Sequence, residues 1–170
     1  MRKISALKLL DEAILPVVLV VFCKIVAIFI LTLVFNIPWS FNSTSGSYSF
    51  YFINFKDASG VFFVSSISDL VMILFVAVGF LWTLFRGSYF REDKLHPITA
   101  ARLHKKGKES LIVDKNKAYH QAAVWLSLSW FTFFLSLDNV LQGSTSLLTF
   151  GVAVVATLGL TVVLLENSRS

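Results

Sequence analysis

The stretch AILPVVLVVFCKIVAIFILTLVF, residues 13–35, decides the fold of this 170-residue chain. Its one charged residue is Lys24, and an apolar run needs roughly 20 residues to cross a hydrocarbon core of about 30 Å. Comparable runs cover residues 61–85, 118–137 and 147–165. Runs of this length are too long for barrel strands, and backbone groups in lipid must be satisfied within a helix. The sequence therefore predicts an all-α membrane protein, a bundle of four transmembrane helices.

The composition also favours a membrane protein over a soluble one. Hydrophobic residues make up 56% of the chain and charged residues 15%. A typical soluble domain has about 45–50% apolar residues, glycine included, and about 25% charged residues. The mean hydropathy is +0.75. A soluble fold of this size could not bury so much apolar surface, and the length suits one integral membrane domain over residues 1–170.

The basic residues predict the orientation of the chain in the membrane. Of the 15 lysines and arginines, 13 lie before the first run, between the second and third runs (residues 86–117), or in the tail at 166–170. These three segments share one side of a four-pass chain. Because basic residues are retained on the cytoplasmic side, we expect both termini in the cytoplasm. The net charge of +5 thus reflects topology, and we expect no nucleic-acid partner.

The predicted first outer loop, residues 36–60, is rich in aromatic residues and poor in charge. Apolar alternation at residues 39–41 and 48–50, on either side of a Gly/Ser-rich segment, predicts a small hairpin. Trp and Tyr are enriched at headgroup depth, so we interpret the aromatics as a belt on the membrane surface. A lid, or a docking surface for another membrane subunit, is the alternative. A second outer loop is predicted at residues 138–146.

The predicted cytoplasmic loop, residues 86–117, contains a signal for a short interfacial helix. Pro97 can occupy the first turn of a helix that Gly107 would end. Basic side chains near a membrane are attracted to anionic lipid, by about 1 kcal/mol each. We expect this segment to contact lipid headgroups or a protein partner through Arg102, Lys105, Lys106 and Lys108.

Lys24 and Asp69 are the two charges well inside the predicted membrane spans. A charge at the centre of a membrane helix costs at least about 2.5–3.5 kcal/mol, so Lys24 should face the bundle and find a partner. Asp69 lies four residues from the middle of the second run, toward the predicted outer side. That offset is about 6 Å along a helix, which a lysine side chain can cover. The sequence therefore predicts a contact between Lys24 and Asp69.

Small and hydroxyl residues form stripes on the predicted helices that can support this pair. Residues three or four apart share one face of a helix, and small polar side chains on such a face allow close packing and hydrogen bonds between helices. The supporting polar stripe comprises Ser65 and Ser68 in the second run and Ser129, Thr132 and Ser136 in the third, and Thr149, Thr157 and Thr161 recur in the fourth.

The chain lacks the sequence patterns of a metal centre or a common active site. The histidines at positions 96, 104 and 120 are spaced too widely for a compact ligand set, and Cys23 has no second cysteine with which to pair. Hydrolase, P-loop and HExxH motifs are missing from the sequence. We expect no metal, no cofactor and no enzymatic activity; a membrane enzyme that uses the histidines of the cytoplasmic loop is one alternative.

We interpret the chain as a non-enzymatic subunit or scaffold of a membrane assembly. Its expected partners are membrane lipids and other membrane subunits or copies of itself. The main alternative is a small transporter or channel for an ion or solute, because ionisable residues inside a membrane are functional candidates by default. In that reading Lys24 and Asp69 would form the polar path.

Overall fold

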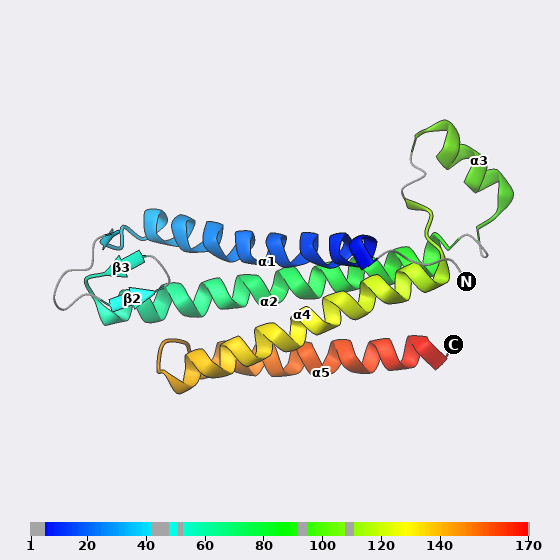
Figure 1. Ribbon diagram of the computed structural model, residues 1–170. Coiled ribbons are helices and arrows are strands. Elements are labelled where there is room, and N and C mark those ends of the chain that lie inside the picture. The colour runs from blue at the N-terminus through cyan, green and yellow to red at the C-terminus, as the bar shows by residue number, and fades with distance from the viewer. Residues whose placement is uncertain (1–5, 42–47, 51–52, 92–94, 108–110, 170) are drawn as a thin grey trace.

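A computed structural model shows a mostly helical protein (Figure 1). The structure describes residues 6–41, 48–50, 53–91, 95–107 and 111–169. Four of its helices are long and apolar enough to cross a membrane, which confirms the four predicted spans at this level. They are α1 (Ala6–Val34), α2 (Ala58–Tyr89), α4 (Lys115–Leu141) and α5 (Leu147–Arg169), and a short helix α3 (Pro97–Lys105) lies between α2 and α4.

Each long helix extends beyond the apolar run that predicted it, at one end or both. The reason is that hydropathy marks the part of a helix that suits lipid, whereas backbone hydrogen bonds continue the helix into polar sequence. The extension matters most at the end of α4, which continues to Leu141. Residues 138–141 are therefore helical. The sequence predicts a loop over residues 138–146, and this prediction is wrong for residues 138–141.

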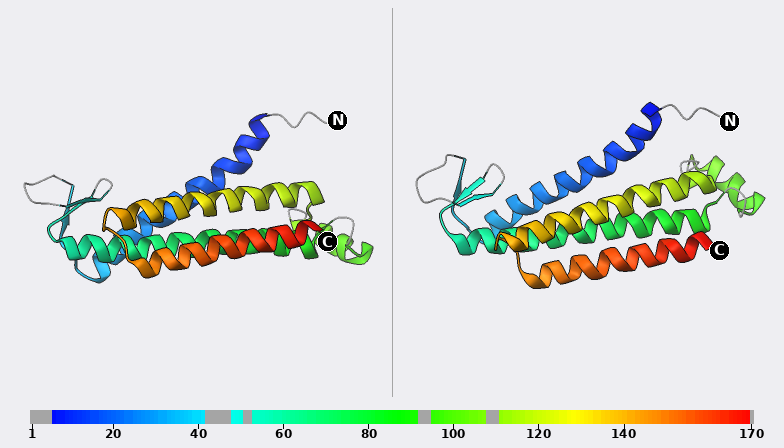
Figure 2. Two further views of the ribbon diagram at one scale, coloured as in Figure 1. Left: turned by 90° about the horizontal axis from the view of Figure 1, so that it is seen from below. Right: turned by 60° about the horizontal axis from the view of Figure 1, so that its bottom comes forward.

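Helix α2 is the centre of the bundle. It packs against α1, α4 and α5, and α5 also packs against α4. Half of the most apolar part of α2 is buried, a larger share than in the other three long helices. Figure 2 shows that the first half of α1 leans away from the other helices, so α1 and α4 have few contacts.

Three apolar clusters form the interior, one after another along α2. The clusters centre on Val64 with the sheet residues, on Met72 and Val76, and on Phe80.

The close approach of α2 and α4 depends on Gly79, since a Cβ there would lie only 2.6 Å from the Trp125 ring.

The connection between α1 and α2 forms a three-stranded antiparallel sheet. Its strands are β1 (Trp39–Ser40), β2 (Tyr48–Phe50) and β3 (Ile53–Phe55), in the order β1-β3-β2. The predicted pairing of residues 39–41 with residues 48–50 is wrong, because β3 lies between these two strands. All three residues of β3 are buried, so the strand that packs on the helices takes the central place.

The two ends of the bundle differ in character. The sheet lies at one end, whereas α3, the start of α1 and the end of α5 lie at the other (Figure 1). This arrangement follows from four successive passes of the chain along the same axis.

Candidate functional site

Lys24 and Asp69 lie in contact inside the bundle. Lys24 Nζ donates a hydrogen bond to Asp69 Oδ1 at 2.5 Å, and this ion pair joins α1 to α2. Lys24 is only 4% exposed and Asp69 is 0% exposed. Burial of an unpaired charge costs several kcal/mol, so each of these side chains needs the other. The structure thus brings together the two charges that the sequence singled out.

The second carboxylate oxygen of Asp69 accepts hydrogen bonds from two further side chains. Asn139 Nδ2 donates to Asp69 Oδ2 at 2.8 Å, and Thr145 Oγ1 donates to the same oxygen at 2.9 Å. Ser65 Oγ lies 2.9 Å from Thr145 Oγ1. Because the Thr145 proton is directed to Asp69, Ser65 is the donor to Thr145. We call this group the Asp69 cluster: Lys24, Ser65, Asp69, Asn139 and Thr145.

The turn between α4 and α5 positions Asn139 and Thr145. Gly143 has a φ of +69°, the left-handed conformation that commonly follows the end of a helix. Ser144 then donates both its N–H and its hydroxyl to the Asn139 carbonyl oxygen, each at 2.9 Å. These bonds fold the chain back over the end of α4, which directs Thr145 toward α2.

The start of α5 is also fastened to α2 by hydrogen bonds. The Ser146 N–H donates to Ser66 Oγ at 2.9 Å, and Thr149 Oγ1 donates to the Ser66 carbonyl oxygen at 3.3 Å. Ser146 Oγ in turn accepts from the Thr149 N–H at 3.1 Å, as an N-cap residue does. The Asp69 cluster therefore lies where α1, α2, α4 and the beginning of α5 are all held together.

A second polar contact, made of hydroxyls, joins α4 to α5. Ser129 Oγ and Thr157 Oγ1 lie 2.9 Å apart, and both side chains are buried. Thr132 Oγ1 donates to the Ser129 carbonyl oxygen at 2.9 Å, within its own helix. We call the Ser129 and Thr157 contact the hydroxyl pair.

The predicted polar stripe is thus divided among different contacts. Ser65 belongs to the Asp69 cluster, whereas Ser68 donates to the Ser65 carbonyl oxygen at 3.1 Å within α2. Ser129 belongs to the hydroxyl pair. Ser136 is buried, and its hydroxyl has no hydrogen-bond partner among the residues that the structure describes. The stripe residues are all buried, and their hydrogen bonds place Ser65 in the Asp69 cluster and Ser129 in a separate contact.

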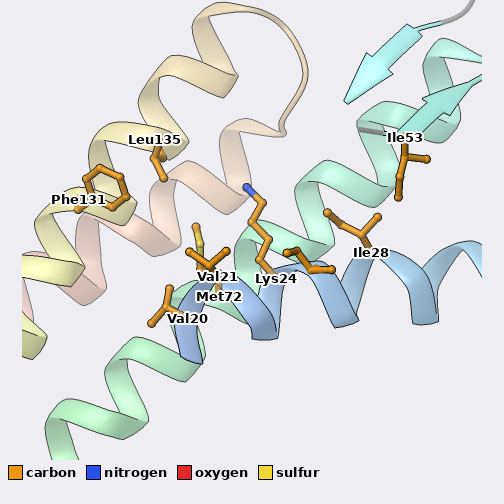
Figure 3. A pocket seen from close by; sticks show the side chains of 9 residues that line it. Val20, Val21, Lys24, Ile28, Ile53, Met72, Phe131 and Leu135 are labelled. Atoms are coloured by element: carbon orange, nitrogen blue, oxygen red, sulfur yellow. The ribbon is translucent and has the colours of Figure 1, made fainter. Parts of the chain in front are cut away.

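An apolar cavity of about 180 Å³ adjoins Lys24 (Figure 3). Its walls are aliphatic and aromatic side chains from α1, α2, α4 and β3, and Lys24 is the one charged residue among the described residues that line it. The Lys24 amino group points away from α1 in this view. Apolar walls offer a hydrated ion no replacement for its water, so this space disfavours ion passage beside the pair.

The predicted basic contact residues lie far from the Asp69 cluster. Arg102, Lys105 and Lys106 are exposed on or directly after α3, and Lys108 lies outside the described residues. His96 begins α3, where its Nδ1 accepts a hydrogen bond from the Ile98 N–H at 3.4 Å. Figure 1 places α3 at the end opposite the sheet, so the basic residues and the ion pair form two separate candidate regions.

The histidines lie in three different settings. His96 and His104 are exposed on α3, whereas His120 is half-buried in α4. Within the described part of the chain, no group of three or more His, Cys, Asp or Glu residues is placed to hold a metal ion.

Asn139 and Thr145 are the site residues that sequence reasoning missed. Asn139 fell in a predicted loop, yet it continues the stripe of Ser129, Thr132 and Ser136 by a further step of three. That periodicity was the signal that could have found it. Thr145 lies in the turn, where no helical period applies, and only its contact with Asp69 reveals its role.

The class of this protein follows from its fold, because comparisons with known proteins give no match. The chain matches no protein-family model, no curated protein and no solved structure. Its four long apolar helices define a multi-pass membrane protein by length and composition.

Proposed function

We propose that this chain is a non-enzymatic subunit or scaffold of a membrane assembly, and that α3 is its contact element. The observation that carries this proposal is that none of the residues of α3 is buried. Isolated helices shorter than about 12–15 residues are marginal in water, and α3 has 9 residues. A covering surface would supply the stability that this short helix lacks.

The side chains of α3 suit a membrane surface or an acidic partner subunit. Ile98 is exposed, as are Arg102 and Lys105, so the helix offers both apolar and basic groups for contact. The basic bias of this loop supports a cytoplasmic position for α3 and for both termini. With that orientation, the sheet lies on the outer side, and exposed Phe41 beside it suits the headgroup region.

The Asp69 cluster fits a structural role in such a subunit. Both oxygens of Asp69 accept hydrogen bonds, and the donors come from α1, α4 and the turn before α5. A carboxylate with these three donors fixes how α1, α2, α4 and the turn before α5 meet. The apolar cavity beside Lys24 adds no polar route, and this favours a scaffold over a transporter.

A small transporter or channel is the second candidate, supported by the position of an ion pair inside a membrane helix bundle. The double variant Lys24→Met/Asp69→Asn tests it by solute flux into vesicles. A flux that the wild-type protein supports and the double variant loses, at equal accumulation, would favour transport. Absence of flux in both proteins favours the scaffold.

Mass measurement after gentle detergent extraction tests the scaffold directly. We expect the wild-type chain to run as a stoichiometric complex, and the triple variant Arg102→Gln/Lys105→Gln/Lys106→Gln to be released from it. Lys56→Gln removes an exposed basic residue near the sheet and should leave the complex intact. A wild-type chain that is extracted alone, and an unchanged mass for the triple variant, would both contradict the proposal.

A further inference from the structure

The cavity beside Lys24 is closed toward the centre of the bundle and open toward the lateral surface of the bundle. Val20, Ile28 and Met72 form part of its floor and are all buried. Two of its lining residues are instead widely exposed, Val21 on α1 and Phe131 on α4. The opening therefore lies between Val21 of α1 and Phe131 of α4, on the lateral surface of the bundle. These two helices diverge in Figure 2.

The chemistry of the walls selects an apolar occupant. In the described part of the chain, Lys24 is the single charged residue that lines the cavity. Its amino group is hydrogen-bonded to Asp69, and its stem contributes methylene groups to the wall. A buried water needs about 2–4 polar partners, and a cavity of about 150 Å³ lined by Leu, Ile and Phe in another protein stays dry and binds benzene. The cavity described here has similar walls and a comparable volume, about 180 Å³.

We propose that this cavity binds a segment of one acyl chain of a membrane phospholipid, which enters sideways between Val21 and Phe131. In a chain whose four long helices suit a bilayer, the medium outside this opening is hydrocarbon. The volume admits a short segment of chain, whereas a phosphate headgroup would meet only the Lys24 amino group, which already donates to Asp69. The bound chain fills the gap between α1 and α4, and so supplies packing that the two helices do not give each other.

This inference is independent of the proposed scaffold function. It concerns the lipid-facing side of α1 and α4, whereas the scaffold proposal depends on α3 at one end of the bundle. Loss of the partner complex would leave the cavity intact, and blocking the cavity would leave the basic residues of α3 unchanged.

Photo-crosslinking in vesicles tests the proposal. The full chain is reconstituted in phosphatidylcholine whose acyl chain carries a diazirine near its middle, and labelled residues are mapped by mass spectrometry. We expect the label to be enriched at Met72 and Leu135, which line the cavity, over Leu158, which is exposed on α5. Equal labelling of cavity-lining and exposed α5 residues would overturn the proposal.

Two valines on the same helix provide a matched pair of variants. Val21 lines the cavity and is 51% exposed, whereas Val18 does not line it and is 55% exposed. Val21→Trp should block the opening and lower labelling of the cavity about tenfold, which corresponds to about 1.4 kcal/mol. Val18→Trp should leave it unchanged. Equal effects of the two tryptophans would contradict a site at this opening.

A second pair keeps the test decisive if Val21→Trp does not fold. Phe131 lines the cavity, and Phe134 on the same helix does not, although both are 57% exposed. Phe131→Ala widens the opening and should change the labelling of Met72, whereas Phe134→Ala should not. Extraction of the purified protein should also yield bound phospholipid. An isoprenoid or a free fatty acid in its place, or the same labelling in both alanine variants, would overturn the assignment.

Discussion

The Asp69 cluster and the hydroxyl pair hold neighbouring helices together by different chemistry. In the Asp69 cluster, a buried ion pair joins α1 to α2, and loss of one partner leaves a charge without compensation. In the hydroxyl pair, Thr157 Oγ1 also lies 3.3 Å from the Ser129 carbonyl oxygen, so alternative acceptors are close at hand. The charged contact therefore specifies its partners strictly, whereas the hydroxyl contact tolerates change.

Breaking the ion pair should give the largest effect. Asp69→Asn leaves Lys24 buried beside a neutral amide, and removal of one partner of a buried pair typically costs about 3–5 kcal/mol. We expect a fall of this size in the free energy of unfolding, measured by denaturant titration of the protein in mixed micelles.

The double variant Lys24→Met/Asp69→Asn is the control for that experiment. Lys24→Met removes the charge that Asp69→Asn leaves without a partner, and the amide oxygen that replaces the carboxylate can still accept from Asn139 and Thr145, so the double variant should recover part of the lost stability. A double variant as unstable as Asp69→Asn would show that the charge of Lys24 is not the cause. The comparison between the two contacts would then lose its basis.

A steric change where α2 packs on α4 should lower the free energy of unfolding by an intermediate amount. Gly79→Ala places a Cβ 2.6 Å from the Trp125 ring, and overpacking of this kind costs about 1–3 kcal/mol. Gly159→Ala is the matched control, since its Cβ would meet nothing within 4 Å. Alanine favours a helix by about 1 kcal/mol over glycine, so the control should be as stable as the wild type or more so. Equal effects at both glycines would argue against close packing of α2 on α4.

The hydroxyl pair should respond more weakly than the ion pair. Thr157→Val removes the hydroxyl that faces Ser129, and hydrogen bonds between membrane helices are worth about 0.6 kcal/mol on average. Thr161→Val is the comparison: the Thr161 hydroxyl donates to the Thr157 carbonyl oxygen at 2.7 Å, a hydrogen bond within α5. Unfolding titrations should rank Thr157→Val as the more damaging of the two. A loss as large as that of Asp69→Asn would erase the distinction between the contacts.

The smallest effect concerns Asp57, an exposed carboxylate outside the membrane spans. Hydrogen bonds from the Ser59 hydroxyl and N–H hold the pKa of Asp57 below its ordinary value of 3.8. A lowered pKa stabilises the fold above pH 3.8, and this stabilisation is lost as the pH falls through the lowered pKa.

Asp57→Asn keeps an N-cap acceptor at the start of α2 but removes the titration. The unfolding midpoints of the wild-type protein and of Asp57→Asn should therefore differ less below the lowered pKa of Asp57 than above it. A difference that does not change with pH would contradict the role of the carboxylate. Both proteins should retain the Asp69 cluster, so this measurement separates an exposed carboxylate from the buried one.

The sequence was sufficient for features that depend on local composition. Four apolar runs predicted the four long helices, and the rarity of charge within them predicted that Lys24 and Asp69 would meet. Both inferences use the cost of placing polar groups in hydrocarbon, which applies wherever the helices finally pack.

Features that depend on tertiary packing could not be predicted in the same way. Hydropathy falls at Asp138, so the sequence predicts the end of this helix too early and assigns Asn139 to a loop, whereas α4 continues to Leu141. The central place of β3 depends on the packing of Ile53 and Phe55 with Ile28 and Val64, residues distant in the sequence. No local alternation reports such burial.

The separation of Lys24 from Asp69 along the chain has a consequence for biosynthesis. Asp69 follows Lys24 by 45 residues. At about 5–20 residues per second, a ribosome adds them in about 2–9 s, during which the lysine of α1 lacks its partner. Since a lone charge in hydrocarbon is costly, α1 and α2 should leave the insertion machinery as a hairpin. Asn139 and Thr145 follow Asp69 by 70 and 76 residues, so the later pair, α4 and α5, closes onto that hairpin last.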